Sequence, residues 1–278
     1  MSENAVKLED KVAVITGSTR GIGRAVAEAY AKEGAQVVIC SRHESAVKEI
    51  CKSLMEQGFS VSGVTADVSL QTDLEKLFQH AIESWGKIDV WINNAGLSGG
   101  MRLLADISEV EITSIINVNF AGTLKACRII IPYFIQQGSG ILINVSGRGG
   151  HRGEASPFLA TYAATKAAVT SLTKSLAKEN KAHPISIHAV IPGMVATDFY
   201  NDIKTSPDLA ASADSLPYVL KALGVPSDIV GRFFVRIAAQ EPGKVTGKVY
   251  SVLSGARLIR GITLLMWYRI TGKIKASM

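Results

Sequence analysis

The sequence predicts a single α/β domain, with a doubly wound parallel sheet of about seven strands and helices on both faces. Short β-branched runs that end in small or polar residues alternate along the chain with longer amphipathic stretches. No internal repeat or low-complexity linker divides the 278 residues, 47% of which are hydrophobic. Alternation of strands and helices is typical of a parallel sheet, and a chain of this length buries one large core.

The first predicted strand, Val12–Thr16, runs into a glycine turn that precedes a helix predicted over 24–33. Glycines let backbone amides approach a pyrophosphate, and a helix N-terminus favours its negative charge. The Gly-x-x-x-Gly-x-Gly spacing is also compatible with an ordinary tight turn. The turn consists of Gly17, Ser18, Thr19, Arg20, Gly21, Ile22 and Gly23.

The second strand is predicted over 36–40 and is followed by a helix over 44–57. In nucleotide-binding sheets the residue after this strand meets the adenosine ribose, where an acid selects an unphosphorylated 2′-hydroxyl. This chain has Ser41 followed by Arg42. Two guanidinium groups, those of Arg20 and Arg42, suit a 2′-phosphate, which favours NADP(H) over NAD(H). The alternative is a pair of solvated surface arginines.

The third strand is predicted to end at Thr65, and the fourth covers 88–92. Small residues at the carboxyl end of a strand let a cofactor pass close to the backbone. The residues just beyond these two strands are Asp67, Val68, Asn94, Ala95 and Gly96. Helices are predicted over 72–85, 108–118 and 123–137, with Asn119 at the junction of the last two, where it caps or kinks the chain or holds a water.

The fifth and sixth strands, over 141–145 and 185–191, flank a helix that carries Tyr162 and Lys166. Residues four apart share one helix face, so both side chains reach the same cavity. An ammonium group lowers the pKa of a nearby tyrosine from its ordinary value near ~10 by stabilising the phenolate. An isolated pair of this kind is more often an ordinary surface pair. After a helix over 226–240, the last strand is predicted over 248–253.

Over about residues 10–255 the chain resembles the short-chain dehydrogenase/reductase family. The matching segments, which agree in order and spacing, are the 16–23 turn, Asp67-Val68, Asn93 to Gly96, Asn119, Tyr162-x-x-x-Lys166, and Pro192-Gly193 with Thr197. The resemblance implies a Rossmann-type fold and hydride transfer between a nicotinamide and a carbonyl or alcohol. It also implies a homodimer or homotetramer that pairs through the helices over 123–137 and 160–180.

The resemblance further implies roles for single residues. Tyr162 is expected to be the general acid in reduction, Lys166 to stabilise the phenolate and bind the nicotinamide ribose, and Asn119 to position a water in a proton relay. The cofactor-binding residues that it implies are Gly17, Ser18, Thr19, Arg20, Gly21, Ile22, Gly23, Ser41, Arg42, Asp67, Val68, Asn94, Ala95, Gly96, Tyr162, Lys166, Pro192, Gly193, Val195 and Thr197.

One position departs from the family pattern. The family usually has a serine after the fifth strand that hydrogen-bonds the substrate oxygen, and Gly147 stands there in this chain. Ser146 is expected to replace it if the backbone shifts by one residue. Loss of one such hydrogen bond costs about 3 kcal/mol of transition-state stabilisation.

Several short matches, including this glycine, resemble the chlorophyll b reductase branch, whose substrate is a large porphyrin-derived aldehyde. The expected substrate is therefore a bulky apolar carbonyl compound. Two alternatives stay open: a 3-oxoacyl-thioester or other ketone reductase, and an NADP-binding sensor or scaffold protein that has lost turnover. An irregular segment over 198–225 is expected to close over the substrate, with Phe199, Tyr200 and Tyr218 as candidate contacts or as ordinary lid packing.

Residues 256–278 are expected to form a basic, apolar extension beyond an NADP-binding domain over 1–255. The extension holds five basic residues and no acid, and without these five the chain has 25 basic and 24 acidic residues. The near-neutral body gives no reason to expect nucleic-acid binding. The apolar run 262–268 is too short to span a bilayer, so it is expected to lie in a membrane interface, on the body or on a neighbouring subunit.

The N-terminus and the cysteines bear on the cellular compartment. Residues 1–10 alternate charged and apolar side chains without the apolar core of a secretory signal, so a cytoplasmic protein is expected, in peripheral contact with a membrane if the extension binds one. Cys40, Cys51 and Cys127 are odd in number and lack metal-ligand spacing. Buried free thiols are expected, and no metal site.

Overall fold

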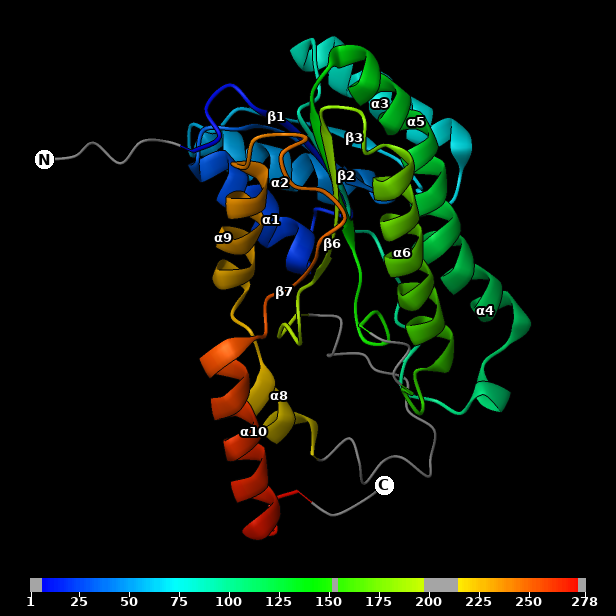
Figure 1. Cartoon of the computed structure of the whole chain (residues 1–278), viewed down its shortest axis with the longest axis vertical. Coiled ribbons are helices and arrows are strands. Elements are labelled where there is room, and N and C mark those ends of the chain that lie inside the picture. Colours follow the sequence, from blue (N-terminus) through cyan, green and yellow to red (C-terminus); the bar gives the residue numbers. More distant parts are fainter. Residues whose placement is uncertain (1–6, 152–154, 198–214, 275–278) are drawn as a thin grey trace, which may run out of the picture.

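The computed structural model describes residues 7–151, 155–197 and 215–274, and its centre is a seven-stranded sheet (Figure 1). The strand order is β3-β2-β1-β4-β5-β6-β7, with every neighbouring pair parallel. The order reverses between β1 and β4, which opens a crevice at the carboxyl ends of the strands. The strands are β1 (Val12–Thr16), β2 (Gln36–Ser41), β3 (Val61–Thr65), β4 (Val90–Asn93), β5 (Gly140–Val145), β6 (Ile185–Ile191) and β7 (Val249–Ser251).

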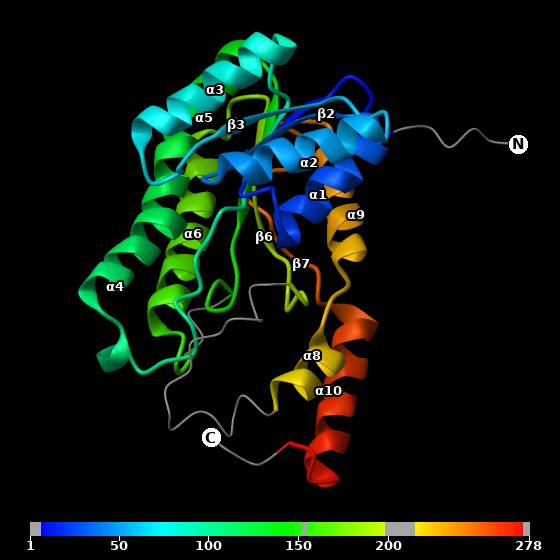
Figure 2. The same ribbon diagram turned by 180° about the vertical axis from the view of Figure 1, so that it is seen from behind.

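Helices cover both faces of the sheet, which confirms the predicted fold class (Figures 1 and 2). Helices α1, α2 and α9 lie on one face, and α3, α5 and α6 lie on the other. The helices are α1 (Gly21–Lys32), α2 (Glu44–Glu56), α3 (Gln71–Trp85), α4 (Glu109–Ile116), α5 (Gly122–Gln137), α6 (Ala160–Glu179), α8 (Leu216–Leu223), α9 (Ser227–Ala238) and α10 (Gly255–Ile270).

Alternate side chains of the central strands point into two apolar cores. In β1, Ala13 and Ile15 belong to the core beneath α1, α2 and α9, whereas Val14 belongs to the core beneath α3 and α5. Because both faces are covered, these strands are apolar throughout, which is why the sequence shows short continuous apolar runs there. Cys40, Cys51 and Cys127 are buried and free, as predicted.

The predicted strand boundaries differ from the structure mainly in β4 and β7. Strand β4 begins at Val90, two residues later than predicted, although the Asp89 N–H still donates to the Val12 carbonyl at 2.9 Å. The hydrogen bonding of the sheet therefore extends beyond the residues assigned to β4. Strand β7 covers three residues rather than the six predicted.

Helices α4 and α5 are continuous through a π-helical turn, Asn117–Ala121, that contains Asn119. A capping box in which the Ser108 hydroxyl accepts from the Glu111 N–H, and the Glu111 carboxylate from the Ser108 N–H, fixes the start of α4. A π turn adds a residue to one helical turn and commonly marks a functional position. The irregularity predicted at Asn119 is confirmed.

The end of the chain forms a helix longer than the apolar run predicted there. Helix α10 packs on α8, where a Cβ at Gly261 would lie 2.7 Å from the Ala222 carbonyl oxygen. Tyr218 and Tyr268 meet edge to face with 5.3 Å between ring centres. Phe199 and Tyr200 lie outside the described residues. The division of the chain at residue 255 stays a prediction.

Candidate active site

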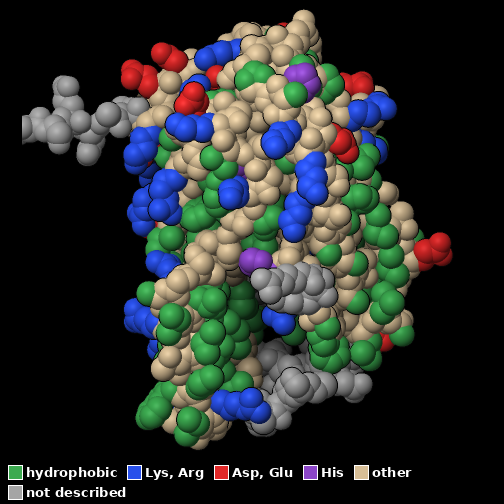
Figure 3. Space-filling view, viewed as in Figure 1, with side chains coloured by type: hydrophobic (Ala, Val, Ile, Leu, Met, Phe, Trp, Pro, Cys, Tyr) green, Lys and Arg blue, Asp and Glu red, His purple; other side chains and the backbone are tan. Residues whose placement is uncertain are grey.

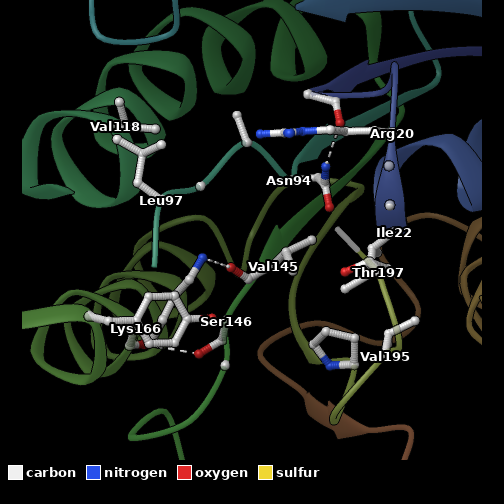
Figure 4. A pocket seen from close by; sticks show the side chains of 18 of the residues that line it. Arg20, Ile22, Asn94, Leu97, Val118, Val145, Ser146, Lys166, Val195 and Thr197 are labelled. Carbon is white, nitrogen blue, oxygen red and sulfur yellow. Dashed lines mark hydrogen bonds between the residues drawn. The ribbon is translucent and has the colours of Figure 1, made fainter. Parts of the chain in front are cut away.

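A cavity of about 410 Å³ lies at the carboxyl ends of the strands (Figure 4). Residues that follow the first six strands line it, together with residues of α6 and α8. Every predicted site residue lines this cavity except Ser18 and Asn119. The sheet topology thus brings together residues that are far apart in the sequence.

The glycine turn after β1 presents backbone to the cavity. Gly17 and Gly21 have φ angles of +65° and +58°, which favour glycine. A Cβ at Gly23 would lie 2.3 Å from the Gly17 carbonyl oxygen and 2.5 Å from Asn94 Nδ2, so this position has no room for a side chain. No side chain among the residues that the structure describes caps the start of α1, so its first N–H groups are available to an anion.

Asn94 and Ser18 hold this turn in place from inside the protein. Asn94 Nδ2 donates to the carbonyl oxygens of Thr16 and Gly17 at 2.9 and 3.1 Å. The Ser18 hydroxyl donates to the Ile15 carbonyl at 2.7 Å and accepts from the Cys40 N–H at 2.9 Å. Ser18 is fully buried and does not line the cavity, so its side chain links β1 to β2 rather than contacting a cofactor as predicted.

Two arginines line the end of the cavity beyond β2. The Arg20 and Arg42 guanidinium groups have no hydrogen-bond or ion-pair partner among the described residues. Ser41 stands where an acid would meet a ribose, and its hydroxyl donates to the His43 carbonyl at 3.3 Å. Asp67 also lines the cavity, and its carboxylate accepts from the Ser69 N–H and hydroxyl.

Tyr162 and Lys166 reach the cavity from one face of α6. Lys166 Nζ donates to the Val145 carbonyl at 2.8 Å and lies 5.7 Å from the centre of the Tyr162 ring (Figure 4). The lysine is 4% exposed, and burial lowers the pKa of its ammonium group to about 8. A buried cation beside a phenol favours the phenolate, which suits proton transfer.

Asn119 lies behind this pair and joins two segments of the site. Its Oδ1 accepts from the Leu97 N–H at 2.7 Å, and its Nδ2 donates to the Leu97 carbonyl at 2.9 Å and to Thr165 Oγ1 at 3.1 Å. The Asn119 carbonyl accepts from the Thr123 hydroxyl at 3.0 Å. The side chain thus fixes the loop after β4 against α6, and sequence reasoning missed both Leu97 and Thr165 as its partners.

Ser146 does not take the place of the missing serine. Its hydroxyl lies 2.7 Å from Thr170 Oγ1 and donates to the Lys166 carbonyl at 2.9 Å, so it is bonded into the backbone of α6. Gly147 is the residue that faces the phenol, since a Cβ there would lie 2.6 Å from the Tyr162 hydroxyl oxygen. Gly147 rather than Ser146 therefore holds the position next to the phenol, and Tyr162 occupies the room that a serine at 147 would need.

Several residues of the cavity carried no recognisable signal in the sequence. Leu97 and Val118 lie on the Lys166 side of the cavity (Figure 4). Met194 pairs with Gly224, which brings Leu223 of α8 to the cavity wall. Apolar residues that line a cavity resemble core residues in a sequence, so no pattern distinguishes them. Leu253, His43 and Arg148 also line the cavity.

The cavity fits a nicotinamide dinucleotide. An uncapped helix start and two guanidinium groups without a partner in the described part of the chain suit phosphates, and the Tyr162 and Lys166 side chains line the same cavity. Within the described ranges, no group of three or more His, Cys, Asp or Glu side chains could hold a metal ion.

A family model described as short chain dehydrogenase matches residues 11–208. The chain belongs to this family. Its members are oxidoreductases that act on CH–OH and C=O groups, and this dehydrogenase is therefore an enzyme of that kind.

Three curated relatives show the range of similar proteins. The 3-oxoacyl-(acyl-carrier-protein) reductase FabG of Thermotoga maritima is 30% identical over 90% of this chain and 99% of its own length. The 3beta-hydroxysteroid dehydrogenase 1 of Eggerthella lenta is 32% identical over 91% and 96%. The probable chlorophyll(ide) b reductase NYC1 of Oryza sativa subsp. japonica is 35% identical over 70% of this chain and 42% of its own length.

Two solved structures share the fold of this dehydrogenase. Actinorhodin polyketide ketoreductase with NADPH is 29% identical, has a TM-score of 0.76, and is matched over 87% of this chain and 95% of its own. The 3-ketoacyl-(acyl-carrier-protein) reductase of Brucella melitensis with NADH is 27% identical, has a TM-score of 0.78, and is matched over 90% and 99%. A nicotinamide cofactor is common to both, while its 2′-phosphate differs between them.

Proposed function

We propose that this dehydrogenase uses NADP(H) and reduces a carbonyl group of a bulky apolar molecule. The observation that carries the cofactor choice is that Arg20 and Arg42 line the cavity and have no partner for their guanidinium groups among the described residues, while Ser41 rather than an acid ends β2. Guanidinium groups bind phosphate with charge-assisted, bidentate hydrogen bonds. Both guanidinium groups would be available to bind the 2′-phosphate.

In the proposed reduction, the bound nicotinamide supplies the hydride. Tyr162 holds a proton at its hydroxyl oxygen and donates it to the substrate oxygen as the carbonyl carbon is reduced. The Lys166 ammonium group, one helical turn away, stabilises the phenolate that remains. Asn119 keeps the Leu97 loop and α6 at a fixed separation. Without a serine hydroxyl at 147, Tyr162 carries the hydrogen bonding to the substrate oxygen.

An apolar substrate is supported by the apolar residues that line the cavity. Leu97, Val118, Met194, Leu223 and Leu253 all line it. Apolar lining with a few polar groups at the reacting centre is typical of sites for apolar ligands. The names of the hydroxysteroid and chlorophyll(ide) relatives favour the same class of substrate.

A 3-oxoacyl thioester is the second candidate substrate. It is favoured by the similarity to the Thermotoga and Brucella reductases, each of which is matched over nearly its whole length. A flexible acyl chain would also suit the apolar lining of the cavity.

The cofactor proposal is tested by steady-state kinetics with NADPH and NADH. Arg20→Ala and Arg42→Ala should each lower kcat/KM for NADPH by about ten- to a hundredfold, because each removes charged hydrogen bonds to the 2′-phosphate. Neither should change kcat/KM for NADH. Arg24→Ala is the matched control, since Arg24 pairs with Glu28 and does not line the cavity. An unchanged NADPH preference in the Arg20 and Arg42 variants would refute the proposal.

The substrate proposal is tested with aldehydes and ketones graded by the size of their apolar part, assayed beside 3-oxoacyl thioesters. We expect kcat/KM to rise with apolar size, and Tyr162→Phe to lower it by about a hundred- to ten-thousandfold while NADPH still binds. Highest activity on the thioesters would favour the second candidate. NADPH binding without turnover on any compound would indicate a sensor or scaffold protein.

A further inference from the structure

Helix α10 exposes an apolar stripe along its whole length. Ile259, Ile262, Met266 and Ile270 follow one another at spacings of three and four residues, which places them on one helix face. These side chains and Trp267 expose 42 to 81% of their surface. Figure 3 shows hydrophobic side chains gathered over the lower end of the molecule, where α8 and α10 lie. A continuous exposed stripe of this kind indicates an interaction surface.

The stripe is not the side of α10 that packs on the body. Gly261 and Tyr268 are the buried residues of the helix, and both contact α8. Helix α10 is therefore apolar on two sides, one used for packing and one exposed. An ordinary surface helix of a soluble domain has a single apolar side.

Positive charge borders the stripe. Arg260 and Arg269 lie on either side of it in the helical repeat, and Lys273 follows the end of the helix. No acidic residue occurs from 256 to 278. The arginines of α10 have no ion-pair partner among the described residues. An apolar stripe between basic side chains, with a tryptophan at its margin, is the pattern of a helix that lies in a membrane interface.

We propose that α10 docks this dehydrogenase on an anionic phospholipid membrane, with the helix lying flat and its apolar stripe in the headgroup region. Sixteen residues of α-helix extend about 24 Å, which is shorter than the hydrocarbon core of a bilayer, so the helix lies in the interface. Among the described residues one helical stretch, Glu109–Gln137, is long and apolar enough to span a membrane, and its α5 part packs on the sheet.

A second copy of the chain is the alternative partner for this face of α10. Two copies that pair through the same stripe would bring their arginines together without any acid on either helix to compensate. Like charges that face one another across an interface are unfavourable. Anionic headgroups supply the missing negative charge, with about 1 kcal/mol of attraction for each basic residue near the surface.

The docked helix lies next to the cavity. Helix α10 packs on α8, and Leu223 of α8 lines the cavity wall. The stripe faces away from α8, so α10 and α8 lie between a membrane bound to the stripe and the apolar lining of the site. Delivery of a lipophilic substrate from the bilayer rests on the proposed function, whereas the docking itself does not.

The test measures binding of the full chain to vesicles of phosphatidylcholine alone and of phosphatidylcholine mixed with phosphatidylserine. We expect binding to the mixed vesicles that weakens in high salt. Replacing Arg260 and Arg269 by Gln should weaken it about fivefold for each arginine, and Met266→Glu with Ile270→Glu at least about tenfold. Trp267 emission should shift to shorter wavelength on binding, and Trp267→Phe should remove the shift.

Met55→Glu with Val110→Glu is the matched control, because these two apolar residues are exposed on α2 and α4, away from α10. This variant should bind vesicles like the native protein. Equal vesicle binding by the native protein and the Met266/Ile270 variant would overturn the proposal, as would a native oligomer that this variant dissociates in the absence of lipid. Reductase activity is measured on water-soluble substrates without vesicles, so failure of docking and failure of the proposed function are distinguishable.

Discussion

Lys166 is the buried cation of the site, and its charge determines how the site responds to pH. Burial lowers the pKa of its ammonium group to about 8, so the charge is lost as pH rises through that value. Without the charge, the phenolate that the proposed proton donation leaves on Tyr162 would be less stable. We therefore expect kcat/KM for carbonyl reduction to fall above about pH 8.

The Lys166→Arg variant is the control for this pH dependence. A guanidinium group keeps its charge throughout the range, so the fall near pH 8 should disappear. Circular dichroism would verify that the variant folds. A fall at the same pH in the arginine variant would assign it to another group.

Gly147 determines how much room the Tyr162 hydroxyl group has, and substitutions at this position can test that. A Cβ there would lie 2.6 Å from the Tyr162 hydroxyl oxygen, so any side chain forces the phenol to move. We expect both Gly147→Ala and Gly147→Ser to lower kcat/KM by at least about tenfold, since small displacements of a catalytic group are costly. The alanine variant measures the effect of displacing the phenol alone, because alanine adds no hydroxyl group that could bond to the substrate. A serine variant faster than the native enzyme would show that the missing hydroxyl limits the reaction instead.

At the scale of elements, the turn between β1 and α1 has no room for a side chain at Gly23. A methyl group at position 23 would collide with the Gly17 carbonyl oxygen and with Asn94 Nδ2. We expect Gly23→Ala to abolish measurable dinucleotide binding and to lower the free energy of unfolding by about 1–3 kcal/mol. Binding is measured by titration calorimetry and stability by urea unfolding. Glu28→Ala, on the same helix but partnered with Arg24 outside the cavity, should change neither.

The elements themselves could be predicted from the sequence because local patterns determine them. β-Branched runs mark β1, β2 and β6, and the glycine turn marks the start of α1. Helix α10 was predicted only as a short apolar run, because its packing side and its exposed stripe merge into one apolar sequence. Periodicity cannot separate two apolar sides without knowing what covers each.

The residues that form the site could be predicted from the sequence more readily than the arrangement of their side chains. Nearly every residue expected at the cavity lines it. Ser18 and Asn119 do not line it, and the hydroxyls of Ser18 and Ser146 bond to buried backbone and to Thr170. The direction of a side chain depends on neighbours that are distant in the sequence, and the spacing of residues in a motif does not identify those neighbours.

At the scale of the whole molecule, we expect a homodimer paired through α5 and α6. Ile116 and Leu124 leave large apolar side chains exposed on the continuous helix that contains α5. Leu124→Glu places a charge in this surface and should yield a monomer in size-exclusion chromatography with light scattering. Met55→Glu on the opposite face should leave the molar mass unchanged. A Leu124 variant with native mass would place the interface elsewhere.

The three cysteines have a consequence for the redox behaviour of the enzyme. Cys40 and Cys127 are buried, and burial raises the pKa of each thiol to about 12, while burial also raises that of Cys51. Thiolate is the reactive form, so the folded enzyme should resist oxidants and alkylating reagents. The rate at which a thiol reagent labels these cysteines then reports how often the core opens. A bound cofactor would contact the residues that follow β1, β2 and β4 in the cavity lining, so it should stabilise the folded state and slow that labelling.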